Sequence, residues 1–158
     1  AFYGVLIWMK NKLLQIGIWS SLLIILDQIS KYFVFKYSHE TIELLGSFFR
    51  IEYSENTGVA FGIPVPFILL IVGNILLIGL LIWIAQKEFD LDRPLGKTAL
   101  ILIISGAFGN IIDRLIHGFV IDFIAIWLWP NFNLADAYIS VGILIMIVFY
   151  GRLKRINK

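Results

Sequence analysis

The sequence predicts an all-α membrane protein with four transmembrane helices and a small β-rich segment outside the membrane. Hydrophobic residues make up 59% of its 158 positions and charged residues only 15%, and the mean hydropathy is +0.89. A water-soluble domain this small cannot bury so much apolar surface, so a bilayer is the expected solvent. The length fits one domain, and we expect residues 1–158 to form a single membrane domain.

The first predicted helix covers about residues 13–35. It follows Met9-Lys10-Asn11-Lys12, a charged stretch that reads as a natural start, so residues 1–8 are interpreted as an extension. The apolar run is long, and no small-residue cleavage site ends it. We therefore expect a retained membrane anchor and not a cleaved secretory signal.

Three further apolar segments are expected to cross the membrane as helices. At a rise of 1.5 Å per residue, each is close to the length that spans about 30 Å of hydrocarbon. They are residues 67–85, 98–115 and 134–150.

The connection between the first two helices, residues 36–66, contains the predicted β-rich segment. Apolar and charged side chains alternate over residues 49–53, the period of two that is typical of a strand. Pro64 and Pro66 are expected to close this loop before the next helix.

Cationic residues set the expected orientation. Nine of the thirteen Lys and Arg residues lie near the two termini or in the connection 86–97. By the positive-inside tendency, both termini face the cytoplasm, and segments 36–66 and 116–133 face outward. The low net charge of +2, with cations mainly at segment ends, does not indicate nucleic-acid binding.

Polar residues inside the predicted helices are candidates for function, because an ionisable group at mid-membrane costs about 3 kcal/mol on insertion scales. Asp27 and Lys31 are four apart on the first helix, so they share a face and can pair. A neutralised buried pair, or a lysine that reaches the interface, explains them without a function. The third helix carries a polar stripe that is either functional or a seam between helices. Its members are Asn110, Asp113, Arg114 and His117.

Asp122 and Asp136 stand in very apolar sequence near the expected outer surface. Pro130-Asn131 between them favours a turn that brings the chain back, so we expect the two carboxyls to meet. Asp113 lies nine residues before Asp122, half a turn off the same face of a continuous helix. We therefore expect Asp113 to point elsewhere.

Two carboxyls brought together cannot both ionise easily, so they share a proton. An aspartic protease uses this state: one carboxylate activates water, and the protonated partner hydrogen-bonds the carbonyl under attack. The spacing leaves a second interpretation open, in which each aspartate only caps a helix near the interface. Asp136 is the clearer case, because it stands at the start of the fourth predicted helix.

Other chemistries fit the sequence less well. The absence of cysteine excludes disulfides, thiolate metal sites and cysteine nucleophiles. No H-E-x-x-H motif is present, and His39 and His117 are the only histidines, so a zinc protease is not expected. Ser105-Gly106 lacks the first glycine of a G-x-S-G motif, which argues against a serine intramembrane protease. We expect neither a metal nor a cofactor.

With these motifs in place, the chain resembles the lipoprotein signal peptidases, also called signal peptidase II or prolipoprotein signal peptidase. The resemblance runs from Asp27 to Gly142 and keeps the family's order of motifs. The matching stretches are Asp27-Gln28 with Lys31, Asn56-Thr57-Gly58-Val59-Ala60-Phe61, Gly106 through Gly109-Asn110 to Asp113-Arg114, Val120-Ile121-Asp122-Phe123, and Phe132-Asn133-Leu134-Ala135-Asp136 with Ile139 and Gly142. Ser105 and Ala137 depart from the family pattern, and both are small residues.

The resemblance implies a bacterial four-helix aspartic peptidase whose catalytic dyad is Asp122 and Asp136. It implies that other polar residues position the carboxyls, contact the substrate or support the loop that covers the site. These are Asn56, Asn110, Arg114, Asn133, Asp27, Lys31 and Asp113.

The resemblance also implies a substrate and a location. The substrate is a diacylglyceryl-modified prolipoprotein, cleaved before the lipidated cysteine by a site toward the outer face of the bacterial cytoplasmic membrane. The implied partners are these prolipoproteins, membrane lipids and globomycin-type inhibitors, and the protein is expected to be a monomer.

Two other classes of protein remain as alternatives. One is a small transporter or proton-conducting protein that uses Asp27, Asp113, Asp122 and Asp136 as a relay. The other is a non-catalytic helical scaffold that uses its polar residues for packing. The expected clustering of the carboxylates toward the outer side disfavours a relay across the bilayer.

Overall fold

The computed structural model describes residues 2–37, 40–58 and 66–154, with side chains from residue 10 onward in these ranges. Some residues singled out in the sequence lie outside the described part of the chain. These are His39, Pro64 and the motif residues Val59, Ala60 and Phe61.

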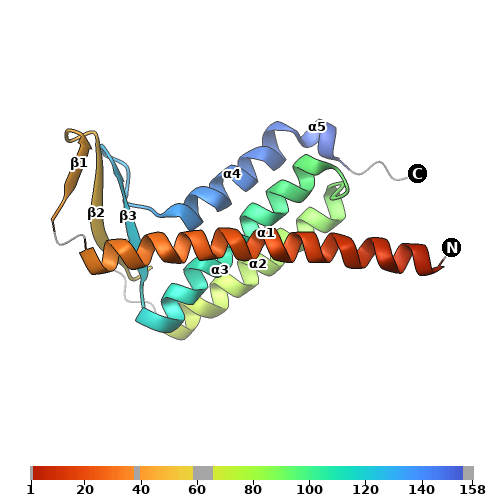
Figure 1. Cartoon of the computed structure of the whole chain (residues 1–158), viewed down its shortest axis with the longest axis horizontal. Coiled ribbons are helices and arrows are strands. Elements are labelled where there is room, and N and C mark those ends of the chain that lie inside the picture. The colour runs from red at the N-terminus through yellow and green to blue at the C-terminus, as the bar shows by residue number, and fades with distance from the viewer. Residues whose placement is uncertain (1, 38–39, 59–65, 155–158) are drawn as a thin grey trace.

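The described chain forms a bundle of helices with a small sheet at one end, and both the start of α1 and the short α5 lie at the other end (Figure 1). The helices are α1 (Phe2–Tyr37), α2 (Phe67–Glu88), α3 (Pro94–His117), α4 (Leu134–Val148) and α5 (Tyr150–Leu153). The strands are β1 (Ile42–Leu45), β2 (Phe49–Asn56) and β3 (Val120–Ile126).

Three helices are long and apolar enough to cross a bilayer, namely α1 over Lys10–Tyr37, α2 and α3. The fourth predicted segment is also helical and apolar, but α4 has only 15 residues and ends at Val148. The short α5 follows it after Phe149.

The first helix starts much earlier than predicted. α1 begins at Phe2 and not near residue 13, so residues 2–8, interpreted as an extension, belong to the helix. No proline separates these residues from Met9, and lysine is a good helix former. The charged stretch after Met9 is therefore a part of α1 and not its boundary.

α3 is the central helix of the bundle. Of its apolar window, 61% is buried inside the protein, against 11% for α1 and 6% for α2. The outer helices therefore turn most of their apolar side chains toward the surroundings, as expected in a bilayer.

Glycines let α3 and α4 approach each other closely. A Cβ at Gly106 would lie 2.1 Å from the backbone oxygen of Ala135, and one at Gly142 would lie 2.8 Å from that of Ala99. Small residues at such contacts are the usual way for membrane helices to pack backbone against backbone. The contact at Gly106 fixes the first turn of α4, which carries Asp136.

The sheet is antiparallel, with the strand order β1-β2-β3. β2 confirms the strand predicted from the alternation over residues 49–53. β3 was not predicted, because segment 116–133 was expected to be a simple outer connection. Apart from Asp122, the strand is apolar on both faces, so it lacks the alternation that reveals a half-exposed strand.

The chain passes directly from the central helix into this third strand. Gly118 ends α3 in the left-handed conformation, with φ 84°, a common way to stop a helix. β3 then pairs with β2 so that Asp122 lies opposite Ser54 and Val120 lies opposite Asn56.

After β3 the chain reverses and returns along the sheet. The turn lies at Trp127–Trp129, where Trp127 has φ 41° and the amide of Trp129 donates to the Ile126 oxygen at 2.8 Å. Phe132 then pairs with Ile124. The predicted return is confirmed, but the turn comes just before Pro130-Asn131 instead of on it.

The two ends of the bundle differ in what they bury. The end away from the sheet holds an apolar core, formed by Ala85, Phe89, Ala99, Leu100, Ile103, Met146 and Leu153. Beneath the sheet, polar side chains are buried together and form the candidate site; they are Asp27, Lys31, Asn110, Asp113, Asp122 and Asn133.

Candidate active site

Asp122 is held in the middle of β3 by two side-chain amides. Its side chain is buried, with 2% of the residue exposed. Asn56 Nδ2, at the end of β2, donates to one carboxylate oxygen at 2.9 Å, and Asn133 Nδ2 donates to the other at 2.7 Å. Both oxygens of a costly buried carboxylate thus have donors.

Asp136 lies in the first turn of α4, where it is part of a capping box with Asn133. The Asn133 side chain accepts from the Asp136 amide at 2.9 Å, and Asp136 Oδ2 accepts from the Asn133 amide at 3.3 Å. Asp136 therefore helps to cap α4, with Asn133 as the N-cap residue, but capping is not its sole contact. The other carboxylate oxygen, Oδ1, takes no part in the capping box and accepts a hydrogen bond from Asn110 Nδ2 at 2.7 Å.

Asn110 and Asn133 join the two aspartates into one cluster. Asn133 Nδ2, which donates to Asp122, also lies 3.2 Å from Asn110 Oδ1. Asn110 in turn donates to Asp136. Two shared amides thus link Asp122 with Asp136, and the direct meeting of the two carboxyls stays a prediction.

The environment of Asp122 favours its protonated form. Burial raises the pKa of Asp122 from 3.8 to about 6, because desolvation disfavours the charged carboxylate. The charge of Asp136 acts in the same direction, and the hydrogen bonds from Asn56 and Asn133 oppose it. One carboxyl of the pair therefore keeps its proton into a pH range where an ordinary aspartate has lost it.

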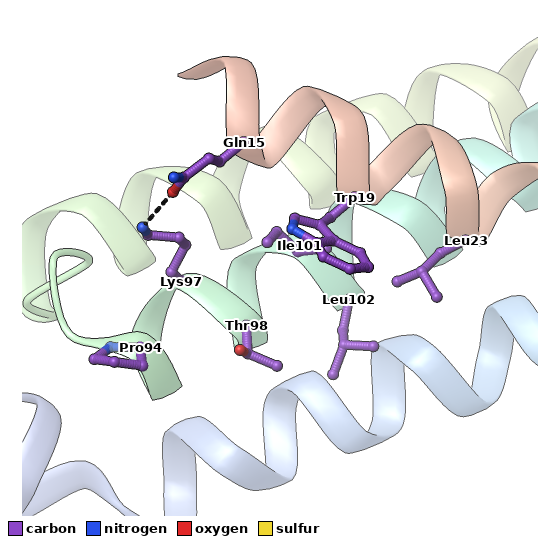
Figure 2. A pocket seen from close by; sticks show the side chains of 8 residues that line it. All are labelled: Gln15, Trp19, Leu23, Pro94, Lys97, Thr98, Ile101 and Leu102. Carbon is purple, nitrogen blue, oxygen red and sulfur yellow. Dashed lines mark hydrogen bonds between the residues drawn. The ribbon is translucent and has the colours of Figure 1, made fainter. Parts of the chain in front are cut away.

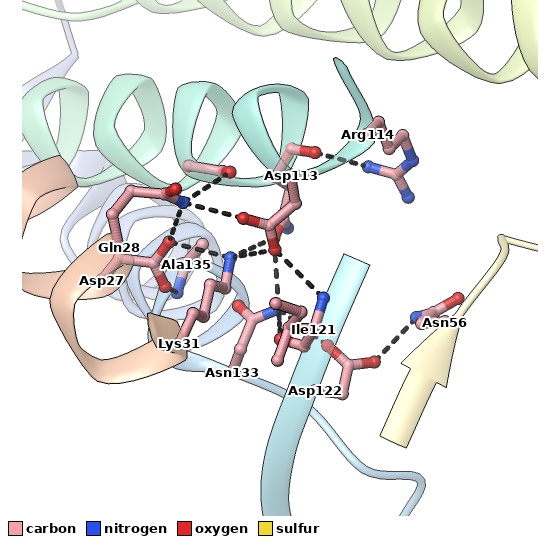
Figure 3. A network of polar contacts seen from close by, with 12 residues as sticks. Asp27, Gln28, Lys31, Asn56, Asp113, Arg114, Ile121, Asp122, Asn133 and Ala135 are labelled. Carbon is pink, nitrogen blue, oxygen red and sulfur yellow. Dashed lines mark hydrogen bonds and ion pairs between the residues drawn. The ribbon is translucent and has the colours of Figure 1, made fainter. Parts of the chain in front are cut away.

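A second buried cluster, the Asp27–Lys31–Asp113 triad, lies next to Asp122 (Figure 3). Lys31 Nζ is 2.8 Å from Asp27 Oδ2 and 2.9 Å from Asp113 Oδ2, and all three residues are at most 1% exposed. The predicted pairing of Asp27 with Lys31 is confirmed. Lys31 also donates to Asn110 Oδ1 at 3.2 Å, so the triad contacts the amide that binds Asp136.

Each carboxylate of the triad also holds a backbone amide next to one of the two site aspartates. Asp27 Oδ1 accepts from the amide of Ala135 at 3.0 Å, and Asp113 Oδ2 accepts from the amide of Ile121 at 3.0 Å. Ala135 immediately precedes Asp136, and Ile121 immediately precedes Asp122. The triad thus anchors the backbone at both ends of the carboxylate pair.

Asp113 occupies a different place from the one the helix geometry predicted. It stays out of the pair, as expected, but the reason given was wrong, because α3 ends at His117 and no continuous helix joins Asp113 to Asp122. Asp113 points to the start of β3 and binds its backbone.

Arg114 and His117 complete the polar stripe of α3 in different ways. Arg114 Nη1 donates to the Asn110 oxygen at 3.3 Å, and its buried Nε has no hydrogen-bond partner among the described residues. His117 lies against Phe35 and Phe119, with ring centroids 5.4 and 5.7 Å away, so it packs outside the cluster.

Gln28 belongs to the site, although the sequence placed it only in the first matching stretch and not among the predicted site residues. Its Nε2 donates to Asp113 Oδ1 at 2.8 Å and to the Gly109 oxygen at 3.2 Å. A polar amide beside Asp27 in an otherwise apolar helix was the available signal. Gln28 satisfies the one Asp113 oxygen that Lys31 does not bind.

The fold and the site define a class of protein: an α-helical membrane protein with a carboxylate pair, buried at Asp122 and partly buried at Asp136, where its bundle meets a small sheet. The family model described as signal peptidase (SPase) II matches residues 19–151. The chain belongs to the signal peptidase II family.

Similar proteins support this assignment over most of the chain. The lipoprotein signal peptidase of Moorella thermoacetica is 40% identical over 128 residues, which cover 79% of this chain and 85% of the relative. That of Thermodesulfovibrio yellowstonii is 39% identical over 156 residues, covering 93% and 100%. A solved structure described as a bacterial membrane enzyme matches with a TM-score of 0.76 and 26% identity, covering 86% of this chain and 92% of the other.

Proposed function

We propose that the chain is an intramembrane aspartic endopeptidase that removes signal peptides from diacylglyceryl-modified prolipoproteins by cutting before the lipidated cysteine. Because the chain belongs to this family, it is a signal peptidase II protease that acts on prolipoproteins. The observation that carries the aspartic mechanism is the pair Asp122 and Asp136, joined by Asn110 and Asn133.

In the proposed mechanism the two carboxyls divide the work of an aspartic peptidase. Asp122 holds the shared proton, because burial raises its pKa to about 6, and donates a hydrogen bond to the scissile carbonyl oxygen. Asp136 acts as the general base and accepts a proton from the attacking water. The water oxygen bonds to the carbonyl carbon, and the proton later passes to the leaving amine as the peptide bond breaks.

The amide and triad residues position this pair in the proposed mechanism. Asn56, Asn110 and Asn133 donate to the carboxylate oxygens, and Asp27 and Asp113 hold the backbone just before each aspartate. Productive geometry has a large effect on rate, since a displacement of about 1 Å can cost a hundredfold. Arg114, whose Nη1 donates to the Asn110 backbone oxygen, is expected to help bind the substrate backbone.

The topology belongs to the same proposal. We place α4 as the fourth crossing, with both termini in the cytoplasm and the sheet at the outer face of the bacterial cytoplasmic membrane. The proposed site then lies where a lipidated cysteine would reach the outer surface. Globomycin-type inhibitors are expected to bind across the pair, and the protein is expected to act as a monomer.

The decisive test is the pair of substitutions Asp122→Asn and Asp136→Asn. Each removes one ionisable carboxyl with little change in shape, so we expect each to lower the rate of prolipoprotein cleavage by at least about a thousandfold. The measurement is the cleavage rate of a lipidated prolipoprotein by purified protein in micelles. Melting temperature shows whether each variant is folded.

The matched control is Asp92→Asn. Asp92 pairs with Lys12 and is exposed at the opposite end of the bundle, so this variant should cleave at the normal rate. Normal processing by either site variant would contradict the proposed dyad.

A further inference from the structure

A groove lies between the first half of α1 and the start of α3, at the end of the bundle remote from Asp122 (Figure 2). Its volume is about 330 Å³. Trp19, Leu23, Ile101 and Leu102 form an apolar stretch, and Gln15 and Lys97 form a polar one. The exposed Trp19 ring beside it suits the aromatic belt at a membrane–water interface.

The polar end of the groove continues into a second hollow of about 210 Å³. The two hollows share Gln15 and Lys97, and the second adds Asn11, Lys12 and Asp92. Together they form one amphipathic groove, which is apolar toward the middle of the bundle and polar toward its end. A phospholipid has the same division along its length.

The charges at the polar end favour an anion. Lys12 forms an ion pair with Asp92. Lys97 Nζ instead donates a hydrogen bond to Gln15 Oε1 at 2.9 Å, and Gln15 carries no charge. The groove lining therefore holds two cations and one anion. The start of α3 adds the positive end of a helix dipole, and its N-cap residue Arg93 makes no side-chain cap hydrogen bond.

We propose that this groove binds an anionic glycerophospholipid, with an acyl chain along Leu23, Ile101 and Leu102 and the phosphate at Lys97. Basic pockets between helices at the cytoplasmic side of membrane proteins bind anionic head groups in this way. The signal helix of a substrate is the other apolar ligand to consider. Its first region is positively charged, so Lys97 and the start of α3 would repel it. The groove is far from the carboxylate pair, and its occupant does not depend on the chemistry proposed there.

The experiment measures which lipid stays bound to the purified protein. Native mass spectrometry compares retention of phosphatidylglycerol with that of phosphatidylcholine of the same chain length. We expect phosphatidylglycerol to be retained preferentially, and Lys97→Gln to lower its retention about fivefold, since one lysine near a lipid surface contributes about 1 kcal/mol. Phosphatidylglycerol should also raise the melting temperature of the unmodified protein more than that of Lys97→Gln.

Lys87→Gln is the matched control. Lys87 lies at the same end of the bundle, on α2, with its ammonium 4.9 Å from the Trp83 ring, and it does not line the groove. It should retain phosphatidylglycerol like the unmodified protein. Prolipoprotein cleavage at the normal rate by Lys97→Gln shows that this variant is folded.

Four outcomes would overturn the proposal. Equal retention of the two lipids would show that the head group is not recognised. An equal loss in Lys87→Gln would show a diffuse surface charge effect and no built site. Displacement of the lipid by saturating prolipoprotein would assign the groove to the signal helix, and displacement by inorganic phosphate alone would reduce it to a phosphate site.

Discussion

At the scale of single residues, Asp122 shows what a buried carboxyl demands from its surroundings. With its pKa raised from 3.8 to about 6, Asp122 favours the folded state at low pH, and this contribution is lost as the pH rises through about 6. The difference corresponds to about 3 kcal/mol at neutral pH. Asn56 and Asn133 reduce this cost, because they donate to the ionised form.

Asn56 provides a direct test of this balance. Its hydrogen bond stabilises the ionised form of Asp122, so Asn56→Ala should raise the pKa of Asp122 further. Because the proposed mechanism needs one proton on the pair, the alkaline limb of the profile of kcat/KM against pH should move upward by about one unit. The measurement is that profile for purified protein with a lipidated prolipoprotein.

Tyr53→Phe is the control for this shift. Tyr53 lies on the same strand and its hydroxyl donates to Glu55, so its removal should leave the alkaline limb in place. A downward shift in Asn56→Ala would contradict the assignment of the retained proton to Asp122.

At the scale of elements, the triad ties three parts of the fold to one another. Asp27 on α1 holds the start of α4, Asp113 on α3 holds the start of β3, and Lys31 forms an ion pair with each of these carboxylates. Removing one partner of such a buried group leaves an uncompensated charge. The triad therefore makes the position of each site aspartate depend on helices that carry neither of them.

The substitutions Asp27→Ala and Asp27→Asn separate positioning from folding. Asp27→Ala removes the acceptor for the Ala135 amide, so we expect kcat to fall about a hundredfold. Asp27→Asn keeps an acceptor oxygen, so it should recover most of this loss. KM should stay within about twofold in both variants, because the buried Asp27 is 0% exposed and cannot touch the substrate. The measurement is steady-state cleavage of a lipidated prolipoprotein.

Asp92→Ala serves as the control, since it breaks an exposed ion pair with Lys12 at the far end. A rise in KM with unchanged kcat in Asp27→Ala would place Asp27 in substrate binding instead of positioning. Equal losses in the alanine and asparagine variants would show that the charge matters and the anchored amide does not.

The elements also show how far the sequence alone predicts the fold. Alternation over residues 49–53 was enough to find β2, and long apolar runs were enough to find the helices. β3 was not predicted, because apart from Asp122 its side chains are apolar on both faces. The start of α1 was predicted too late, because the charged stretch after Met9 resembles the start of the chain segment that forms the helix. The hydrogen bonds from the Ala135 and Ile121 amides to the triad join residues far apart in the sequence. A local sequence pattern cannot predict such contacts.

At the scale of the whole molecule, the bundle is divided into a polar end and an apolar end. Polar groups are buried beneath the sheet, where asparagine amides and Lys31 bind the carboxylates, whereas the opposite end packs through residues such as Ala99, Ile103 and Leu153. Basic residues of the connection between α2 and α3 lie at the apolar end. This division underlies the proposed orientation, with the sheet outside.

Reporter fusions test that orientation. A reporter fused after Ser47, in the turn between β1 and β2, should be active only as an extracytoplasmic enzyme. One fused after Asp90, between α2 and α3, should be active only in the cytoplasm. The measurement is paired phosphatase and fluorescence activity in cells, and the opposite pattern would invert the proposed topology.

The capping box at the start of α4 also decides where the chain can change length. The turn at Trp127–Trp129 is exposed, so residues gained or lost there would leave Phe132 beside Ile124 and both carboxylates in place. One residue gained between Asn133 and Asp136 would instead rotate Asp136 by about 100° around the helix axis and separate it from Asn110. The chain can therefore gain or lose residues in the turn before Asn133, but the spacing from Asn133 to Asp136 must stay constant.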